Sequence, residues 1–378
     1  MIKKGLLLIF TIILVFACGG NDDDENIDTG GGNNGTDTTN ASYDRGAMLE
    51  HIADDIIIPA LEAFQDDIDD LDATTTAFTD SPTSETLASV QASYVQAYKT
   101  WQYVEMFNIG KAEEIIYSSL LNIYPTSAEN IEDNISTGTY DLTHPNNFAS
   151  QGLPALDYLL YGVANDNDAI VNVFSSNDNA ANYKQYLLDV VSRISTLTDT
   201  VVDDWNTSFK DSFVASTDNT ATSSFNLLVN DFVFYYEKGF RANKFGIPAG
   251  VFSTDPLPDN VESLYNKGLS KELALIALQA IEDFFNGKAY DSDVEELGLK
   301  AYLEALDNTE LSTTILNQIA LGRAKINELD DSLYQQIIDD KTLVLQTFDE
   351  LQKVVPYLKS DMLSAFSISV DYVDADGD

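Results

Sequence analysis

Apolar side chains recur at the spacing of an α-helix along almost the whole chain, and this repeat most constrains the fold. Near the start of the folded part, Leu49, Ile52, Ile56 and Ala60 follow one another at intervals of three or four residues, which places them on one face of a helix. A strand-like alternation is found only in the short stretch Ser367–Val373. The sequence therefore predicts an all-α protein.

Turns rich in glycine, asparagine or aspartate separate the predicted helices. Pro59 is expected to kink the first helix, because proline has no N–H to donate to the preceding turn. The stretch Asn165–Asn182 is polar and is expected to form turns. The main helices are predicted at 49–71, 82–104, 126–135, 151–162, 183–209, 225–240, 272–285, 294–306, 311–329 and 333–358.

The N-terminus resembles a lipoprotein signal peptide. Lys3 and Lys4 precede an apolar run from Leu6 to Phe16, and Ala17 precedes Cys18. This run is too short for a comfortable membrane span, and it has the order of a secretory signal. We predict that residues 1–17 are removed and that Cys18 is lipidated; an ordinary secretory signal is the alternative. Cys18 is the only cysteine, so an intramolecular disulfide is excluded.

Residues 18–42 are predicted to form a disordered acidic tether. They contain almost no apolar side chains, and such a segment cannot bury enough surface to become ordered. The acidic residues Asp22, Asp23, Asp24 and Glu25 resemble surface-export tags of lipoproteins. We therefore expect an outer-membrane lipoprotein that faces either the periplasm or the cell exterior.

The chain is strongly acidic, with a formal net charge of −42. Removing residues 1–17 takes away two lysines and no acid, which changes the charge to −44. Nucleic acid is excluded as an expected partner, because phosphate binding depends on lysine and arginine. Charge of this kind favours solubility over any particular site.

The segment Gln151–Gly162 has two distinct helical faces. Its leucines recur at the spacing of a buried side, while Pro154, Asp157, Tyr158 and Tyr161 lie together on another side. Pro154 suits the first turn of a helix, where its missing N–H costs nothing. The second face is the candidate for ligand contact.

This segment is similar to the G-x-H-x-x-E motif of the imelysin family, which is also classed as a peptidase family. Further blocks that resemble the family, in its bacteroidete lipoprotein branch, are Asp54–Phe64, Tyr94–Gly110, Arg241–Phe252, Val261–Tyr265 and Leu358–Asp378. Their order along the chain carries the resemblance. It implies two packed helical-bundle domains, which we place at 43–215 and 216–378, with the motif near their interface.

The chain departs from the family motif at both reactive positions. Pro154 stands where the family has histidine, and Asp157 stands where it has glutamate. No catalytic residue and no metal ligand is therefore carried over. The resemblance implies a link with iron or haem acquisition, with iron or haem as the ligand and uptake proteins as partners. The sequence favours a non-enzymatic binding or accessory lipoprotein; a metal-dependent peptidase and a scaffold for a partner are the alternatives.

Arg241 and Lys244 are scarce cations ahead of a glycine-proline loop. They are expected either to contact an anion or carboxylate, such as Asp157, or to complement the helix dipole. Aromatic side chains at helical spacing, including Trp101, are expected more often in a core than around a cofactor. The predicted ligand-binding residues are Gly152, Pro154, Asp157, Tyr158, Tyr161, Trp101, Arg241 and Lys244.

Common catalytic and metal-binding motifs are missing from the sequence, including H-E-x-x-H, G-x-S-x-G and the Walker loop. His51 and His144 are the only histidines. His51 with Asp54 or Asp55 has the spacing of a weak metal site, but an exposed polar helix face is the more common explanation. His144 lies in a loop that leads into the motif, where it either returns an imidazole to the site or is simply solvated.

Overall fold

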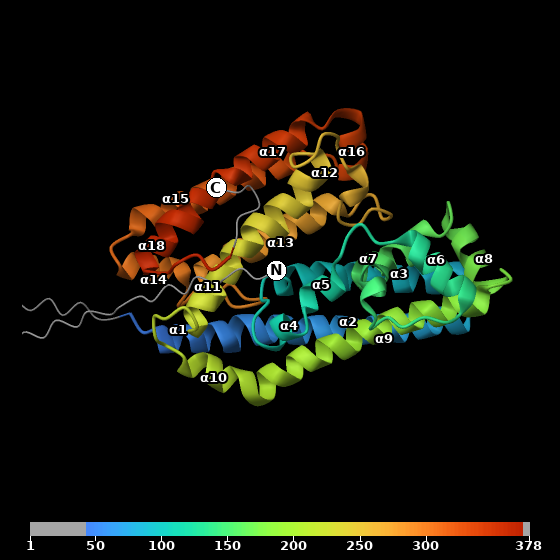
Figure 1. The fold of residues 1–378 in the computed structure, drawn as a ribbon, viewed down its shortest axis with the longest axis horizontal. Coiled ribbons are helices and arrows are strands. Elements are labelled where there is room, and N and C mark those ends of the chain that lie inside the picture. Colours follow the sequence, from blue (N-terminus) through green and yellow to red (C-terminus); the bar gives the residue numbers. More distant parts are fainter. Residues whose placement is uncertain (1–42, 373–378) are drawn as a thin grey trace, which may run out of the picture. The chain divides into compact units, whose positions relative to one another are not determined.

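The computed structural model describes residues 43–372, so the predicted signal peptide, Cys18 and the tether at 18–42 lie outside the described residues. Within residues 43–372 every regular element is a helix (Figure 1), which confirms the predicted all-α class. Residues 367–372 form no strand, so the single strand candidate was wrong over that range. In the same described part, no helix has both the length and the apolar character needed to cross a membrane.

In the first half, the long helices α2, α3 and α9 pack side by side (Figure 1). The shorter helices α6 and α8 lie at one end of this group, and α5 lies nearer its middle (Figure 1). The elements are α1 (Arg45–His51), η1 (Ile52–Ile57), α2 (Ile58–Asp80), α3 (Ser84–Val104), α4 (Lys111–Glu114), α5 (Tyr117–Leu121), α6 (Ala128–Thr137), η2 (Pro145–Ser150), α7 (Gly152–Asp157), η3 (Tyr158–Gly162), α8 (Asn167–Ser175), α9 (Ala180–Asp204), η4 (Trp205–Phe209) and α10 (Lys210–Ala215).

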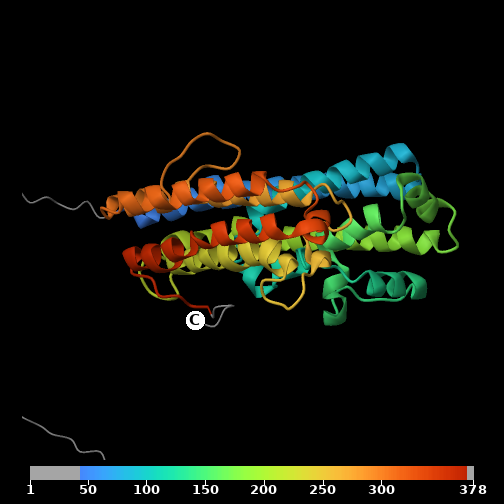
Figure 2. The same ribbon diagram turned by 90° about the horizontal axis from the view of Figure 1, so that it is seen from above.

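In the second half, α13, α15, α17 and η5 pack against one another, and α13 also packs on α3 of the first half (Figure 2). The elements are α11 (Ser224–Phe234), η5 (Tyr235–Gly246), α12 (Ile247–Ala249), η6 (Pro258–Asn260), α13 (Ser270–Asn286), α14 (Leu299–Ala305), α15 (Thr309–Asn327), α16 (Leu333–Asp340), α17 (Thr342–Gln352), η7 (Tyr357–Met362) and α18 (Leu363–Phe366). The predicted division between 215 and 216 falls at the end of α10, and two separate domains stay a prediction.

Local sequence explains where several helices begin. Thr83 caps α3, because its hydroxyl accepts from the backbone N–H of Thr86 while the Thr86 hydroxyl accepts from the N–H of Thr83. Ser127 caps α6 in a similar way, through the N–H of Asn130. Pro59 lies in the first turn of α2, directly after a π-helical segment. The beginning of each of these helices depends on contacts within one turn, and such contacts can be predicted from the sequence.

Three predicted segments need correction. The polar stretch 165–182 contains α8, which begins because the Asp166 side chain accepts from the N–H of Ala169. The helix predicted at 294–306 begins only at Leu299, since residues 294–298 belong to a loop. The helix predicted at 333–358 is interrupted at Lys341 and again after Gln352. At 294–298 the prediction failed because apolar residues lie in a loop. At 165–182 it failed because a side-chain cap begins a helix in a polar stretch.

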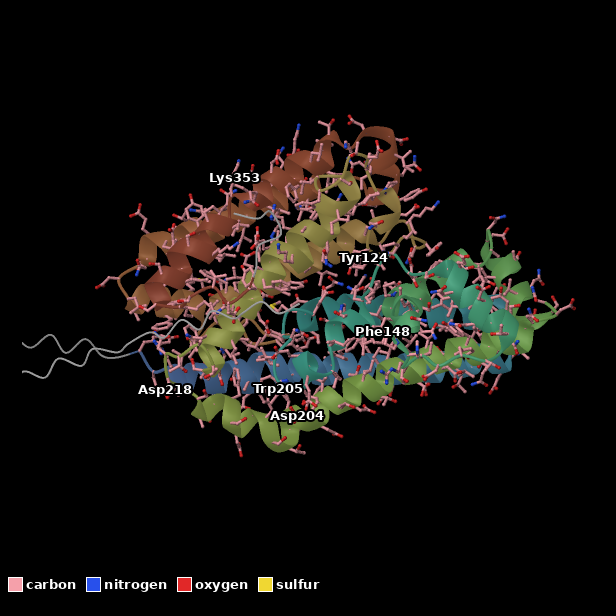
Figure 3. The ribbon with its side chains drawn as sticks, viewed as in Figure 1. Tyr124, Phe148, Asp204, Trp205, Asp218 and Lys353 are labelled. Carbon is pink, nitrogen blue, oxygen red and sulfur yellow. The ribbon has the colours of Figure 1, made fainter. Side chains whose placement is uncertain are left out.

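The hydrophobic core is continuous and contains residues of both halves. Trp101 of α3 is fully buried, with its ring 5.3 Å from the ring of Phe64 and 5.3 Å from that of Tyr117. Side chains fill the space between the helices, and Tyr124 lies where helices of the two halves meet (Figure 3). This contact region holds most of the buried polar side chains described next.

Candidate functional site

The segment Gly152–Gly162 is built into the core as α7 and η3. Its leucines at 153, 156, 159 and 160 are fully buried, which confirms the predicted apolar face. Gly152 has φ +77°, and a Cβ there would lie 2.3 Å from the carbonyl oxygen of Leu121. A side chain at this position is therefore excluded by both conformation and space.

Asp157 is buried, with 1% of its surface exposed. Its carboxylate accepts from the backbone N–H of Tyr265 at 2.7 Å, from the N–H of Asn266 at 3.0 Å and from the hydroxyl of Ser263 at 3.3 Å. Burial raises the pKa of Asp157 to about 6, and these hydrogen bonds oppose the rise. We call this arrangement the Asp157 clamp, because one side chain holds the backbone of residues 263–266.

The clamped backbone includes a strained residue. Ser263 has φ +57°, a left-handed conformation that is uncommon for residues other than glycine. Its hydroxyl donates to Asp157 or to the carbonyl of Asn266. Such a conformation persists when its surroundings fix it, and the Asp157 clamp supplies that restraint.

Next to the clamp lies a buried charged network around Lys244. Lys244 is 2% exposed, and its Nζ lies 2.5 Å from Glu262 Oε2, 2.8 Å from Gln102 Oε1 and 3.7 Å from Glu105 Oε2. The other oxygen of Glu262 accepts from Gln102 at 3.2 Å and from Asn122 at 2.9 Å. The network links α3 to η5 and to the segment that Asp157 holds.

Glu105 gives the network an excess of negative charge, because Lys244 faces two carboxylates. Burial raises the pKa of Glu105, while the Lys244 charge opposes the rise. The Glu105 carboxylate also accepts from Asn122 at 2.7 Å and from the hydroxyl of Tyr235 at 3.1 Å. Glu105 thus belongs both to the buried network and to the wall of a neighbouring cavity.

This interhelical cavity has a volume of about 570 Å³ and is lined by residues of both halves, among them Glu105, Asn122, Tyr124, Asp231 and Tyr235. Burial is the main cause that raises the pKa of Asp231 to about 8, and the nearby acids Glu113 and Asp371 contribute to the rise. Asp231 Oδ2 is buried and has no hydrogen-bond partner among the described residues. The cavity therefore contains a carboxyl group with one oxygen that forms no hydrogen bond to the described residues.

None of the eight predicted ligand-binding residues is among the described residues that line this cavity. Gly152, Pro154, Asp157 and Trp101 are buried in the core. Lys244 contacts the carboxylate of Glu262, and Asp157 holds the backbone that follows Glu262. These two predicted residues are thus linked through one segment.

The other predicted residues make separate contacts. The hydroxyl of Tyr158 donates to Glu132 at 2.6 Å, and the ring of Tyr161 lies 6.0 Å from that of Tyr94. Arg241 is buried with its guanidinium 4.4 Å above the ring of Phe348, a cation–π geometry. These contacts stabilise the packing around the motif.

Sequence reasoning missed Glu262, Gln102, Glu105 and Asn122. One sequence signal could have identified Glu262. A buried lysine requires a buried acidic partner, and Glu262 is the acid in the Val261–Tyr265 block that follows Lys244 in the chain. The positions of Glu105 and Asn122 depend on how distant segments pack. Their contribution follows only from the tertiary structure.

His51 is buried, so the exposed helix face expected for it was wrong, and both histidines have hydrogen-bond partners. His51 Nδ1 lies 2.8 Å from Asp55 Oδ2, and His51 Nε2 lies 2.9 Å from the carbonyl oxygen of Gly287. His144 caps the 3₁₀ segment that begins at Pro145. Among residues 43–372, no group of three or more His, Cys, Asp or Glu side chains is placed to hold a metal ion.

Known proteins provide an independent comparison. The model of the imelysin family matches residues 57–354. An imelysin-like protein from Psychrobacter arcticum is similar over 87% of this chain and 97% of its own, with 19% identity and a TM-score of 0.68. A protein named as an iron-regulated protein A precursor, from Parabacteroides distasonis, is similar over 85% and 95%, with 17% identity and a TM-score of 0.71. No curated protein matches.

Proposed function

This chain belongs to the imelysin family, and from that premise we propose that it is a non-enzymatic binding protein of the cell envelope that serves iron or haem acquisition. Its ligand site would be the interhelical cavity. One solved structure of the same fold belongs to a protein named as iron-regulated. The name links that relative with iron, and it is our reason for proposing the same link for this chain.

The engagement of Asp157 carries the non-enzymatic part of the proposal. Both carboxylate oxygens accept hydrogen bonds from the segment 263–266, so this side chain is committed to holding the backbone. Pro154 offers no side-chain donor, acceptor or metal ligand. The motif positions thus support the fold beside the cavity, and they offer no acid/base pair for hydrolysis.

The interhelical cavity has the size and chemistry of a ligand site. Its volume of about 570 Å³ lies within the usual range of roughly 300–1,000 Å³ for small-ligand pockets. Aromatic rings and carboxyl groups line it together, with Tyr124 and Tyr235 near Glu105 and Asp231. The aromatic rings suit the π-system of haem, and the carboxyl groups suit the iron that haem or an iron chelate contains.

Envelope attachment rests on the sequence. Cys18 follows a signal-like segment, and lipidation there would anchor the chain to the outer membrane. Metabolic labelling with a palmitate analogue is expected to tag the wild-type protein and to leave the Cys18→Ser variant untagged. Equal labelling of both would remove the anchor from the proposal.

The binding function can be tested on the chain from Tyr43 onward, which contains all described elements. Titration with haemin and with ferric citrate, followed by absorbance, is expected to show saturable binding of at least one of them. Glu105→Gln is expected to weaken this binding about tenfold, because it removes a carboxylate charge that would face the ferric ion. The exposed Asp349 provides the control variant Asp349→Asn.

Two outcomes would overturn the proposal. Absence of saturable binding of both probes would remove the iron or haem link. Peptide cleavage that requires bound metal, and is lost in an Asp157→Ala variant that stays folded in thermal melts, would favour the alternative, a metal-dependent peptidase. Elemental analysis of the purified protein accompanies both assays.

A further inference from the structure

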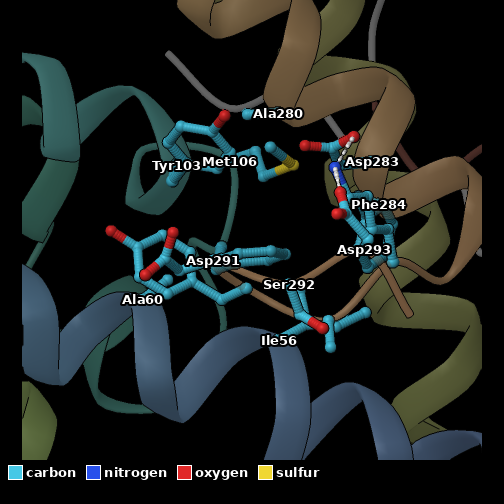
Figure 4. A pocket seen from close by; sticks show the side chains of 14 residues that line it. Ile56, Ala60, Tyr103, Met106, Ala280, Asp283, Phe284, Asp291, Ser292 and Asp293 are labelled. Atoms are coloured by element: carbon cyan, nitrogen blue, oxygen red, sulfur yellow. Dashed lines mark ion pairs between the residues drawn. The ribbon is translucent and has the colours of Figure 1, made fainter. Parts of the chain in front are cut away.

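A second cavity, of about 390 Å³, lies between α2, the C-terminal end of α3, α13 and the loop Gly287–Gly298 (Figure 4). We call it the loop cavity. It shares only Met106 with the interhelical cavity. The motif segment does not contribute to it, so it is a separate feature of the described fold.

The neck of the loop is held by close backbone packing. Gly287 has φ +71°, and a Cβ on it would lie 2.8 Å from the Cα of Gly298. A Cβ on Gly298 would lie 2.5 Å from the Cα of Gly287. His51 fixes the same neck from α1 through the carbonyl of Gly287. The two glycines therefore bring the ends of the loop together where no side chain fits.

Pro59 fixes the loop at a second point. Proline has no N–H to donate to the carbonyl four residues earlier, which here belongs to Asp55. That carbonyl oxygen accepts instead from the backbone N–H of Tyr290 at 2.8 Å. The π-helical segment Ile52–Ile57, which ends just before Pro59, supplies Ile56 to the cavity wall. An irregular helix and the loop thus build one side of the cavity together.

The loop cavity has an apolar and aromatic part beside its charged groups. Its apolar lining residues are Ile56, Ala60, Met106, Phe107, Ala280, Phe284 and Ala289. The rings of Tyr103 and Tyr290 pack edge to face at 5.5 Å. Burial raises the pKa of Tyr103 to about 12, so its hydroxyl is neutral at physiological pH. This interior suits the body of a small apolar or aromatic molecule.

The charged groups of the cavity have a negative balance. Asp283, Asp291 and Asp293 face a single cation, Lys288. Lys288 Nζ lies 3.7 Å from Asp283 Oδ1 and 4.0 Å from Asp293 Oδ1, and these ion pairs are the dashed lines of Figure 4. Asp283 is the more buried acid, with 16% of its side chain exposed, whereas Asp293 is fully exposed. Negative charge therefore exceeds positive charge by two, since three acids meet one lysine.

We propose that the loop cavity binds a small organic cation, an amine carried on an aromatic or short apolar body. The ammonium group would lie beside that of Lys288, where it faces the remaining negative charge of Asp283 and the loop acids, and the body would lie against the tyrosine pair. Aromatic faces attract such cations, and the negative balance excludes an anionic ligand of the same size. This site goes beyond the proposed function and does not depend on it.

Phenethylamine is the probe for this site, and phenylpropionate is its anionic counterpart. Isothermal titration of the full-length protein in detergent is expected to show binding of the amine and none of the acid. Asp283→Asn is expected to raise the Kd for the amine about tenfold. Asp293→Asn, at a fully exposed position, is expected to raise it less, and Asp349→Asn is expected to leave it unchanged.

Lys288→Met gives a result that a purely structural role would not produce. Removing the resident ammonium frees Asp283 and Asp293 for the ligand, so the amine is expected to bind more tightly than to the wild type. The proposal is overturned if phenethylamine fails to bind at millimolar concentration, if phenylpropionate binds equally well, or if Asp283→Asn matches Asp349→Asn. Thermal melts of each variant verify that it is folded.

Discussion

Two regions of the molecule each bury a carboxyl group, and the two groups differ in how many hydrogen bonds they accept. Asp157 accepts three hydrogen bonds from the segment 263–266, and its pKa rises only to about 6. Asp231 lines the interhelical cavity with a buried oxygen that has no partner in the described residues, and its pKa rises to about 8. A buried acid with partners stabilises a fold, whereas one without partners is available to a ligand.

Lys244 connects these regions, and its loss is expected to have the largest effect. Lys244→Met leaves Glu262 and Glu105 buried without their cation, which is expected to destabilise the protein by about 3–5 kcal/mol. The measurement is the free energy of unfolding in urea. A change below about 1 kcal/mol, the typical value of an exposed pair, would show that the network is solvated in solution.

Disruption of the Asp157 clamp is expected to have the second-largest effect on stability. Asp157→Asn replaces one accepting oxygen by an NH₂ group, which cannot accept from the N–H of Tyr265 or Asn266. We expect a loss of about 2 kcal/mol from the buried donor left without a partner. Proteolysis of the segment 263–266 should accelerate in this variant. An unchanged stability would mean that the clamp does not hold the segment, and the contrast with Asp231 would fail.

Asp231 is expected to affect the pH dependence of stability. Its folded pKa of about 8 lies above the ordinary aspartate value of about 3.9 in an unfolded chain. The folded state therefore binds the extra proton, and stability is lost as pH rises through the folded pKa. Between pH values of about 6 and 8, the free energy of unfolding is expected to fall by up to roughly 1.4 kcal/mol per pH unit.

Asp231→Asn is expected to flatten this slope, because the titrating group is gone. Urea unfolding of both proteins at the two pH values measures the difference. If the slopes are equal, the buried oxygen of Asp231 has a partner in solution, and the two regions no longer differ in the way described.

Loss of a surface lysine is expected to have the smallest effect on the free energy of unfolding, and it serves as the reference for the buried lysine. Lys353 pairs with Glu350 at 2.7 Å, and 58% of its side chain is exposed. Lys353→Met is expected to change the free energy of unfolding by less than about 0.5 kcal/mol. A loss comparable to that of Lys244→Met would indicate that charge number, and not burial, sets the cost.

Local patterns allowed the sequence to predict much of the fold. Gly152 and Pro154 mark the start of α7, and the spacing of its leucines predicts the buried face. The position of Trp101 in an aromatic stripe agrees with its burial in the core. Such features depend on neighbours within a few residues of the chain, so one sequence contains enough information to predict them.

The site depends on contacts between distant segments. Glu105 and Glu262 pair with Lys244 from different parts of the chain, and Asn122 donates to both carboxylates. No periodicity of the sequence predicts these contacts. The π-helical segments, such as Tyr235–Gly246, also shift the register of side chains relative to a regular helix. Face assignments based on a period of 3.6 residues lose accuracy beyond such a segment.

The glycine neck at Gly287 and Gly298 separates the tip of its loop from the helices that carry the fold. Residues between Tyr290 and Val294 can change in length and chemistry while the neck and the α13 packing stay the same, because loop tips tolerate insertions far better than packed elements do. The mouth of the loop cavity can therefore change in this chain at little cost to stability. The same property makes the tip a suitable place to graft a new recognition sequence.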